Sequence, residues 1–159
     1  MRSQSMGTTV EIANDLFSDQ SLLHRQRLIV LVPDIDFDEI VFGKAVWHLA
    51  AEPKKEVEVL AVVRDPDSEL RAVHRTTALA AVIRDTRIRI RTHIVYHRSW
   101  LAALRGLWRP GDLLVCLATH QVRVHLLGKQ PAGQFLAGKL GAQCLILPSS
   151  NGSSRLGRT

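Results

Sequence analysis

Short runs of apolar residues alternate along the chain with stretches in which apolar residues recur every three or four positions. The runs cover residues 28–32, 57–63, 113–118 and 143–147. Runs of this length, bounded by turn-forming residues, predict strands that are buried on both faces, as in the middle of a parallel sheet. A further strand is expected over residues 88–95. Arginine alternates there with apolar residues, so this strand should lie nearer an edge.

Helical spacing fills the intervals between these strands. It predicts helices over residues 37–52, 69–84, 100–108 and 132–140, while residues 120–130 are expected to form a long loop. Pro33 ends the first strand, and Pro53 ends the first helix. For the second helix the pattern predicts an inward face made of Leu70, Val73, Thr77, Ala80, Ala81 and Val82.

Strands that alternate with helices require right-handed crossovers and a parallel sheet. The sequence therefore predicts a Rossmann-like, three-layer α/β/α sandwich with five strands, spanning residues 27–148. Residues 1–26, with a weak helical pattern from Val10 to Gln26, are expected to be an N-terminal arm or a junction with another domain. Residues 149–159 have the composition of a disordered tail.

Composition narrows the class of protein. The length of 159 residues and a hydrophobic content of 46% suit one globular domain. Cys116 and Cys144 lie inside apolar runs and are interpreted as core thiols of a reducing compartment. No apolar run approaches the roughly 20 residues that a bilayer requires, and the first residues lack a signal-peptide core. A cytoplasmic protein without membrane insertion is expected.

The formal net charge of +6 raises the question of nucleic-acid binding. The arginines are spread over several predicted elements, and no aromatic residues interleave with them as in single-strand-binding proteins. A solvated basic surface is therefore favoured over a nucleic-acid site.

The order of elements, with Leu31-Val32-Pro33-Asp34 closing the first strand and a helix–strand unit closing the domain, resembles the universal stress protein family. The resemblance implies a sheet order of 3-2-1-4-5 and a homodimer, often formed through the last strand, here Cys144 to Leu147. It also implies, for one branch of the family, ATP held between the ends of the first and fourth strands. Pro33 and Asp34 would then lie on the adenine side, and Val62 and Val63 would supply backbone contacts.

In that branch a Gly-x2-Gly-x9-Gly-Ser/Thr loop after the fourth strand surrounds the phosphates. When Gly128 is aligned with the last glycine, the first two fall on Val115 and Ala118, so the loop is not reproduced. ATP remains the one candidate cofactor, but binding of the usual kind is not expected. The stretch after the fourth strand instead offers Thr119, Arg123, Gly128 and Lys129 around the start of the last helix, which is a candidate site for a small anion or nucleotide. The alternative is that apolar residues pack this stretch down while its charges face water.

Other chemistry is less well supported. The sequence has no Gly-x-Ser-x-Gly elbow and its seven histidines never adopt a metal-ligand spacing, so neither a catalytic residue nor a metal site is predicted. Asp34, Asp36, Asp38 and Glu39 are interpreted as helix-capping acids in preference to a cation site. The function predicted is a universal-stress-like binding or regulatory module without catalysis. The alternatives are an ATP-binding member with slow hydrolysis, and a soluble regulatory domain of a membrane transporter.

Overall fold

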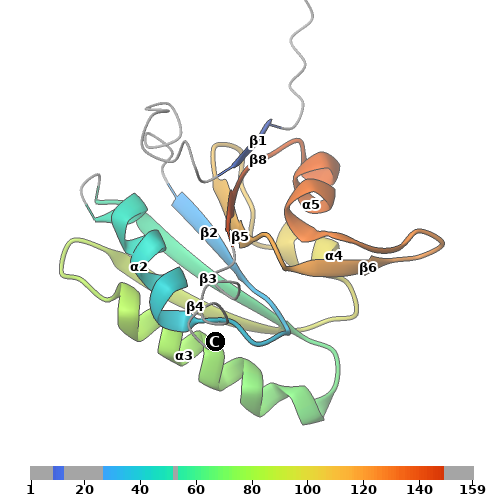
Figure 1. Ribbon diagram of the computed structural model, residues 1–159, viewed down its shortest axis with the longest axis horizontal. Helices are drawn as coiled ribbons and strands as arrows, with labels where there is room; N and C mark the ends of the chain where they lie inside the picture. Colours follow the sequence, from blue (N-terminus) through green and yellow to red (C-terminus); the bar gives the residue numbers. More distant parts are fainter. Residues whose placement is uncertain (1–8, 13–26, 52–53, 149–159) are drawn as a thin grey trace, which may run out of the picture.

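Parallel strands form one sheet through the centre of the molecule (Figure 1). The computed structural model describes residues 9–12, 27–51 and 54–148, and within these the sheet has six strands in the order β1-β8-β5-β2-β3-β4. The strands are β1 (Thr9–Ile12), β2 (Arg27–Val32), β3 (Glu56–Val63), β4 (Arg89–Tyr96), β5 (Leu113–Leu117) and β8 (Gln143–Leu147). The five strands from β2 onwards have the predicted 3-2-1-4-5 order, so the predicted fold class is confirmed.

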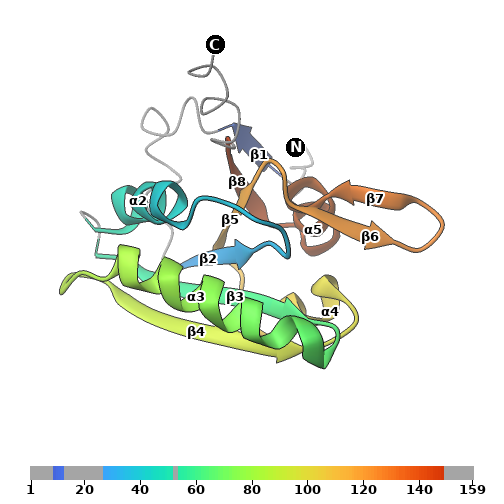
Figure 2. The ribbon, with the colours of Figure 1, turned by 60° about the horizontal axis from the view of Figure 1, so that its bottom comes forward.

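Helices cover both faces of the sheet. One face is packed by α2 (Glu39–Ala50) and α3 (Glu69–Ile83), which follows a short 3-10 turn η2 (Pro66–Ser68); Figure 2 shows these helices in front. The other face is packed by α4 (Trp100–Arg105) and α5 (Ala132–Leu140). Because successive side chains of a strand point to opposite faces, β2 contributes Leu28, Val30 and Val32 to one core and Ile29 and Leu31 to the other. This explains why its sequence is continuously apolar.

Local signals set three of the helix ends. The Asp38 carboxylate accepts hydrogen bonds from the backbone amides of Ile40 and Val41, both at 3.0 Å, and so caps α2. The Ser99 hydroxyl accepts from the amide of Ala102 and caps α4. Gly141 ends α5 in the left-handed conformation, with φ of 65°.

Two details of the helices differ from the prediction. α4 ends at Arg105, three residues before the predicted end. In α3 the residues that pack inward are Thr76, Leu79 and Ile83, whereas three of the predicted ones are exposed: Leu70, Thr77 and Ala81. The helix is rich in alanine and valine on all sides, so its sequence contains no sharply defined apolar stripe from which the buried face can be chosen.

The strand β8 is not an edge of the sheet, contrary to the prediction. β1 pairs with it in parallel, with Thr9 opposite Gln143 and Ile12 opposite Ile146. Val10, placed in a weak helical pattern by the sequence, thus belongs to a strand, while residues 13–26 lie outside the described part of the chain, as does the predicted tail from 149. The predicted dimer through Cys144 to Leu147 requires a free edge on β8, but β1 of the same chain occupies that edge.

The stretch after β5 is not a loop either. Residues 121–131 form an antiparallel hairpin of β6 (Gln121–Val124) and β7 (Gly128–Pro131), with Arg123 directly opposite Lys129. The turn between them is closed by a hydrogen bond from the Leu127 amide to the Val124 carbonyl, and Leu126 adopts a φ of 72°. Glycine is the residue usually found in this left-handed turn position. Because leucine occupies it here, the sequence pattern did not predict the hairpin.

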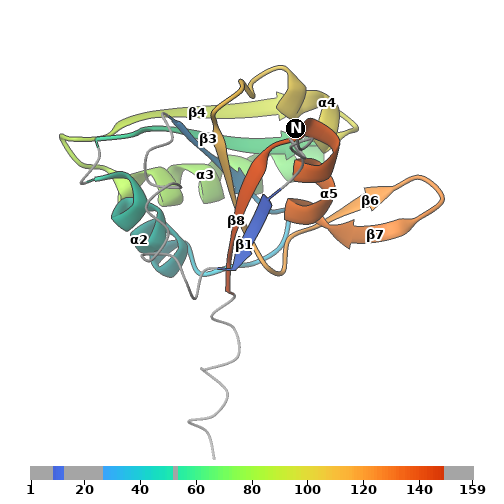
Figure 3. The same ribbon diagram turned by 90° about the horizontal axis from the view of Figure 1, so that it is seen from above.

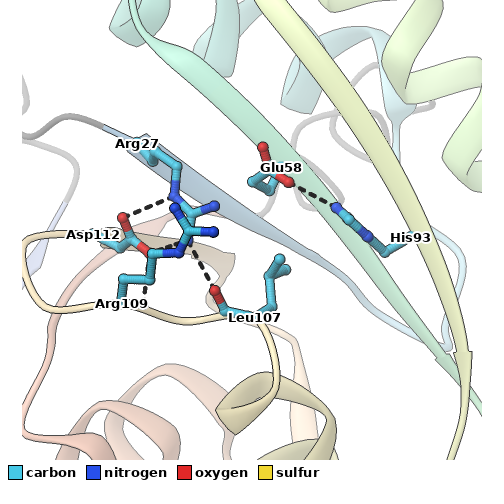
Figure 4. A network of polar contacts seen from close by, with 6 residues as sticks. All are labelled: Arg27, Glu58, His93, Leu107, Arg109 and Asp112. Atoms are coloured by element: carbon cyan, nitrogen blue, oxygen red, sulfur yellow. Dashed lines mark hydrogen bonds and ion pairs between the residues drawn. The ribbon is translucent and has the colours of Figure 1, made fainter.

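A buried ion pair joins the amino ends of the two central strands (Figure 4). Arg27, the first residue of β2, donates from Nε and Nη2 to the two carboxylate oxygens of Asp112, at 3.0 Å and 2.6 Å. Nη2 also donates to the Leu107 carbonyl, and Asp112 accepts from the Arg109 amide. The hydrogen bond to Asp112 raises the pKa of Arg27 despite the opposing effect of burial. The loop between α4 and β5 is thereby fixed to β2.

We expect Arg27→Ala to lower the free energy of unfolding by about 3–5 kcal/mol, because it leaves a buried carboxylate without its counter-ion. Urea denaturation measures this change. Arg75→Ala is the matched control, since it breaks pairs with the exposed Asp34 and Asp36 and should cost less than about 1 kcal/mol. The double variant Arg27→Ala with Asp112→Ala should be less destabilised than the sum of the two single variants. Equal costs for Arg27→Ala and Arg75→Ala would contradict the role assigned to the buried pair.

Candidate functional site

The two central strands, β2 and β5, are followed by connections that lead to opposite sides of the sheet. From β2 the chain passes through α2 to β3, whereas from β5 it passes to β8 on the opposite side of the sheet. The connections that leave the carboxyl ends of β2 and β5 therefore diverge, and such a divergence is where ligands bind in open α/β sheets. The residues at this point are Pro33 and Asp34 after β2 and Thr119 after β5.

A cavity of about 340 Å³ opens at this point. Four segments contribute to its wall: the segment after β2, the end of β3 with the residue that follows it, the start of α4, and the hairpin that follows β5. The residues that line it are Asp34, Ile35, Val62, Arg64, Trp100, Thr119, His120, Gln121, Arg123 and Lys129. Its volume lies at the lower end of the roughly 300–1,000 Å³ that ligand cavities span.

The charges around the cavity favour an anion. Three cationic side chains, Arg64, Arg123 and Lys129, face one carboxylate, Asp34. That carboxylate is itself approached by Arg75 from outside the cavity, at 3.4 Å. No ion pair is recorded for the three cations within the described residues. Cations that converge on a concave surface without counter-ions raise the local concentration of anions.

The hairpin holds two of these cations in an unfavourable arrangement. Arg123 and Lys129 are cross-strand neighbours, and like charges directly opposite one another destabilise an antiparallel pair. An anion between them removes that repulsion. Because the β6 and β7 backbones pair with each other, the hairpin presents side chains to the cavity where a glycine-rich loop would present amide groups.

Five of the predicted site residues come together here. Asp34, Val62, Thr119, Arg123 and Lys129 all line the cavity. The other three do not. Pro33 is buried and borders a separate, smaller pocket. Val63 is buried and its carbonyl accepts a hydrogen bond from the His97 amide, while Gly128 borders a separate groove on the hairpin.

The start of α5 does not take part in the cavity, contrary to expectation. The Ala132 amide donates to the His120 carbonyl at 2.8 Å, so it is not available to an external anion. Gly133 allows the helix to approach the sheet closely: a Cβ atom at this position would lie 2.6 Å from the Cys116 sulfur. The helix therefore seals the core beneath the hairpin, and the cations of the hairpin remain as the anion-attracting groups.

Five residues of the cavity wall were not among the predicted site residues, namely Ile35, Arg64, Trp100, His120 and Gln121. Arg64 is the first residue after β3, and the rule that ligands gather at carboxyl ends of strands applies to it as well as to Asp34. Trp100 is buried and also lines the cavity, where its ring contacts that of His120 edge to face with centroids 4.9 Å apart.

His120 is the buried titratable group of this wall. Only 2% of its surface is exposed, and neither ring nitrogen has a hydrogen-bond partner within the described residues. Burial lowers its pKa to about 4. The imidazole is therefore neutral at physiological pH and adds no charge to the three cations.

No cluster of three or more histidine, cysteine, aspartate or glutamate side chains is arranged to hold a metal ion within residues 9–12, 27–51 and 54–148. None of the helices in the same residues is long and apolar enough to cross a membrane.

The buried His120 should make stability depend on pH. Between pH 6.5 and 4 the unfolded chain binds a proton that the folded chain does not, so the free energy of unfolding falls as the pH is lowered. We expect a loss of about 2 kcal/mol between pH 7.5 and 5, measured by urea denaturation. His120→Asn, which cannot titrate, should flatten this dependence, whereas His74→Asn at an exposed position of α3 should leave it unchanged. The same slope in all three proteins would refute the assignment.

No protein-family model matches the chain, and no curated protein is significantly similar to it. Among solved structures it is similar to a universal stress protein crystallised in complex with cAMP. The sequence identity is 21%, the alignment covers 79% of this chain and 98% of the other, and the TM-score is 0.46. A likeness this loose conveys neither ligand nor activity.

Proposed function

We propose that this protein is a universal-stress-like binding module of the cytoplasm that takes a small phosphorylated ligand into the cavity at the carboxyl edge of its sheet, and that it regulates without catalysis. The observation that carries the proposal is the charge of the wall. Three cations face one carboxylate around a cavity of about 340 Å³. Phosphate, with its multiple charges and acceptor oxygens, is the group that arginine and lysine bind most readily in such a setting.

The polar groups of the wall favour binding over chemistry. Asp34 is 65% exposed and interacts with Arg75, which leaves it poorly placed to act as a general base. The nitrogens of His120 are buried in the protein interior. The thiols of Cys116 and Cys144 lie 3.7 Å apart beneath α5, and their free state suits a reducing compartment.

The hairpin also favours a mode of binding that differs from a glycine cradle. Between Ala118 and Pro131 the chain has one glycine, Gly128, and its φ of 76° serves the hairpin bend. Phosphate contacts would come from the side chains of Arg123, Lys129 and Arg64, so affinity should depend strongly on ionic strength.

Isothermal titration calorimetry with inorganic phosphate, AMP and ATP at about 50 mM salt tests the proposal, because exposed charges interact strongly below physiological ionic strength. Lys129→Ala should weaken binding by about tenfold, as expected for the loss of one charged hydrogen bond, and Arg123→Ala combined with Lys129→Ala should abolish it. Lys139→Ala, which removes a cation from the far end of α5, is the matched control and should bind like the wild type.

Asp34→Ala should bind phosphate at least as well as the wild type, since it removes the one carboxylate of the wall. Two results would count against the proposal. The first is absence of binding for all three ligands at low salt. The second is micromolar ATP affinity that survives high salt and is lost in Asp34→Ala, which would identify an adenine-centred site.

A further inference from the structure

Exposed apolar side chains gather along one edge of the molecule. Every large apolar residue that is exposed within the described chain belongs to a segment at the carboxyl edge of the sheet or to the first turns of the helices that start there. They fall into two groups. One lies on the hairpin tip (Leu126 and Leu127), and the other lies after β2, in the first turns of α2 and α3, and at the end of β4 (Ile35, Ile40, Val41, Leu70 and Tyr96).

The hairpin tip is built to display its side chains. The hairpin extends away from the body of the molecule in all three views (Figures 1, 2 and 3). Leu126 is 91% exposed although its left-handed φ of 72° is unfavourable for a residue with a side chain. An open groove of about 460 Å³ runs along the tip beside it, lined by Arg123, Val124, His125, Leu126, Gly128 and Lys129. The tip therefore combines apolar contact with positive charge.

The second group combines apolar contact with negative charge. Of the fifteen carboxylate residues of the chain, seven lie in residues 34–39 and 65–69, beside Ile35 and Leu70; they are Asp34, Asp36, Asp38, Glu39, Asp65, Asp67 and Glu69. Tyr96 joins this group through a hydrogen bond with Glu69, which raises the tyrosine pKa. Arg64, Arg71 and Arg75 offset part of this charge. Residues 113–159, which include the hairpin, contain no carboxylate residue.

We infer that the two groups bind each other between two copies of this chain. The hairpin tip of each copy, Leu126 and Leu127 with Arg123, His125 and Lys129, would contact the acidic patch of the other, formed by Ile35, Asp36, Asp67, Glu69, Leu70 and Tyr96. Ile35 of the acidic patch lines the same cavity as Arg123 and Lys129 of the hairpin, so a two-fold axis near the cavity mouth would form both contacts at once, as a self-complementary interface requires. A contact between the two hairpins alone is disfavoured because both are cationic.

A second copy fits this edge better than a lipid surface does. Anionic lipid would attract the hairpin, but it would also meet the carboxylates of residues 34–39 and 65–69, which lie at the same edge. A second copy supplies an opposite charge to both groups and an apolar partner to each.

Sedimentation velocity in buffer free of phosphate and nucleotide tests the inference independently of ligand binding. The full chain should be a dimer at about 50 µM and low salt, and should dissociate as salt is raised. Leu126→Asp with Leu127→Asp should weaken association by at least about tenfold, as expected for the loss of central apolar anchors. Arg105→Glu, a charge reversal on α4, is the control that should stay dimeric.

A charge exchange makes the test specific. Arg123→Glu with Lys129→Glu in one protein, and Asp36→Lys with Asp67→Lys in another, should each give a monomer that remains folded by circular dichroism. Mixing the two should restore a dimer, because both contacts of the mixed pair then join opposite charges. A wild-type monomer at this concentration, a dimer that survives the leucine substitutions, failure of the folded variants to reassociate on mixing, or a monomer that co-sediments with phosphatidylserine vesicles would each overturn the inference.

Discussion

The bidentate pair between Arg27 and Asp112 is the contact on which the geometry of the cavity depends. It fixes the amino ends of β2 and β5 against each other, and hydrogen bonds to Leu107 and Arg109 bring in the loop that precedes β5. Because strands are stiff over five or six residues, alignment at one end determines where the other end lies. The carboxyl ends of the same two strands are where Asp34 and Thr119 meet the cavity. A buried polar contact at the amino ends of these strands thus positions the binding wall at their carboxyl ends.

The hairpin gives this cavity its chemical character. A glycine-rich loop would bind phosphate through amide groups whose positions are set by the backbone. Here the backbone groups of β6 and β7 form hydrogen bonds with each other, and long cationic side chains provide the contacts to the anion instead. Side chains of this kind adapt to different anions but lose more conformational freedom on binding. Selectivity among phosphorylated ligands must then come from the uncharged part of the wall, around Trp100 and Val62.

The sequence predicted the elements whose signals are local. The apolar runs identified β2, β3, β5 and β8. Asp34 was named through the family resemblance, and Thr119, Arg123 and Lys129 through the polar stretch after the fourth strand; all four line the cavity. Where the structure depends on contacts distant in sequence, prediction failed. β1 is a strand because β8 offers it an edge, and Val10 carries no sign of this. The hairpin turn has Leu126 where glycine is usual. The anion site was expected at the amides of α5, but Ala132 is already bonded to His120.

The two proposals share Arg123 and Lys129, and this sharing has a thermodynamic consequence. An anion in the cavity neutralises cations that would otherwise attract the acidic patch of a second copy, so the electrostatic part of association weakens when ligand is bound. Linkage requires the reverse as well: association must lower the affinity of the cavity for its anion by the same factor. The apolar contribution of Leu126 and Leu127 is independent of this competition, since these side chains lie at the tip and do not line the cavity. The balance between these contributions determines whether the ligand merely loosens the dimer or separates it, and gives a charge-neutralising ligand a direct means of changing the state of the protein.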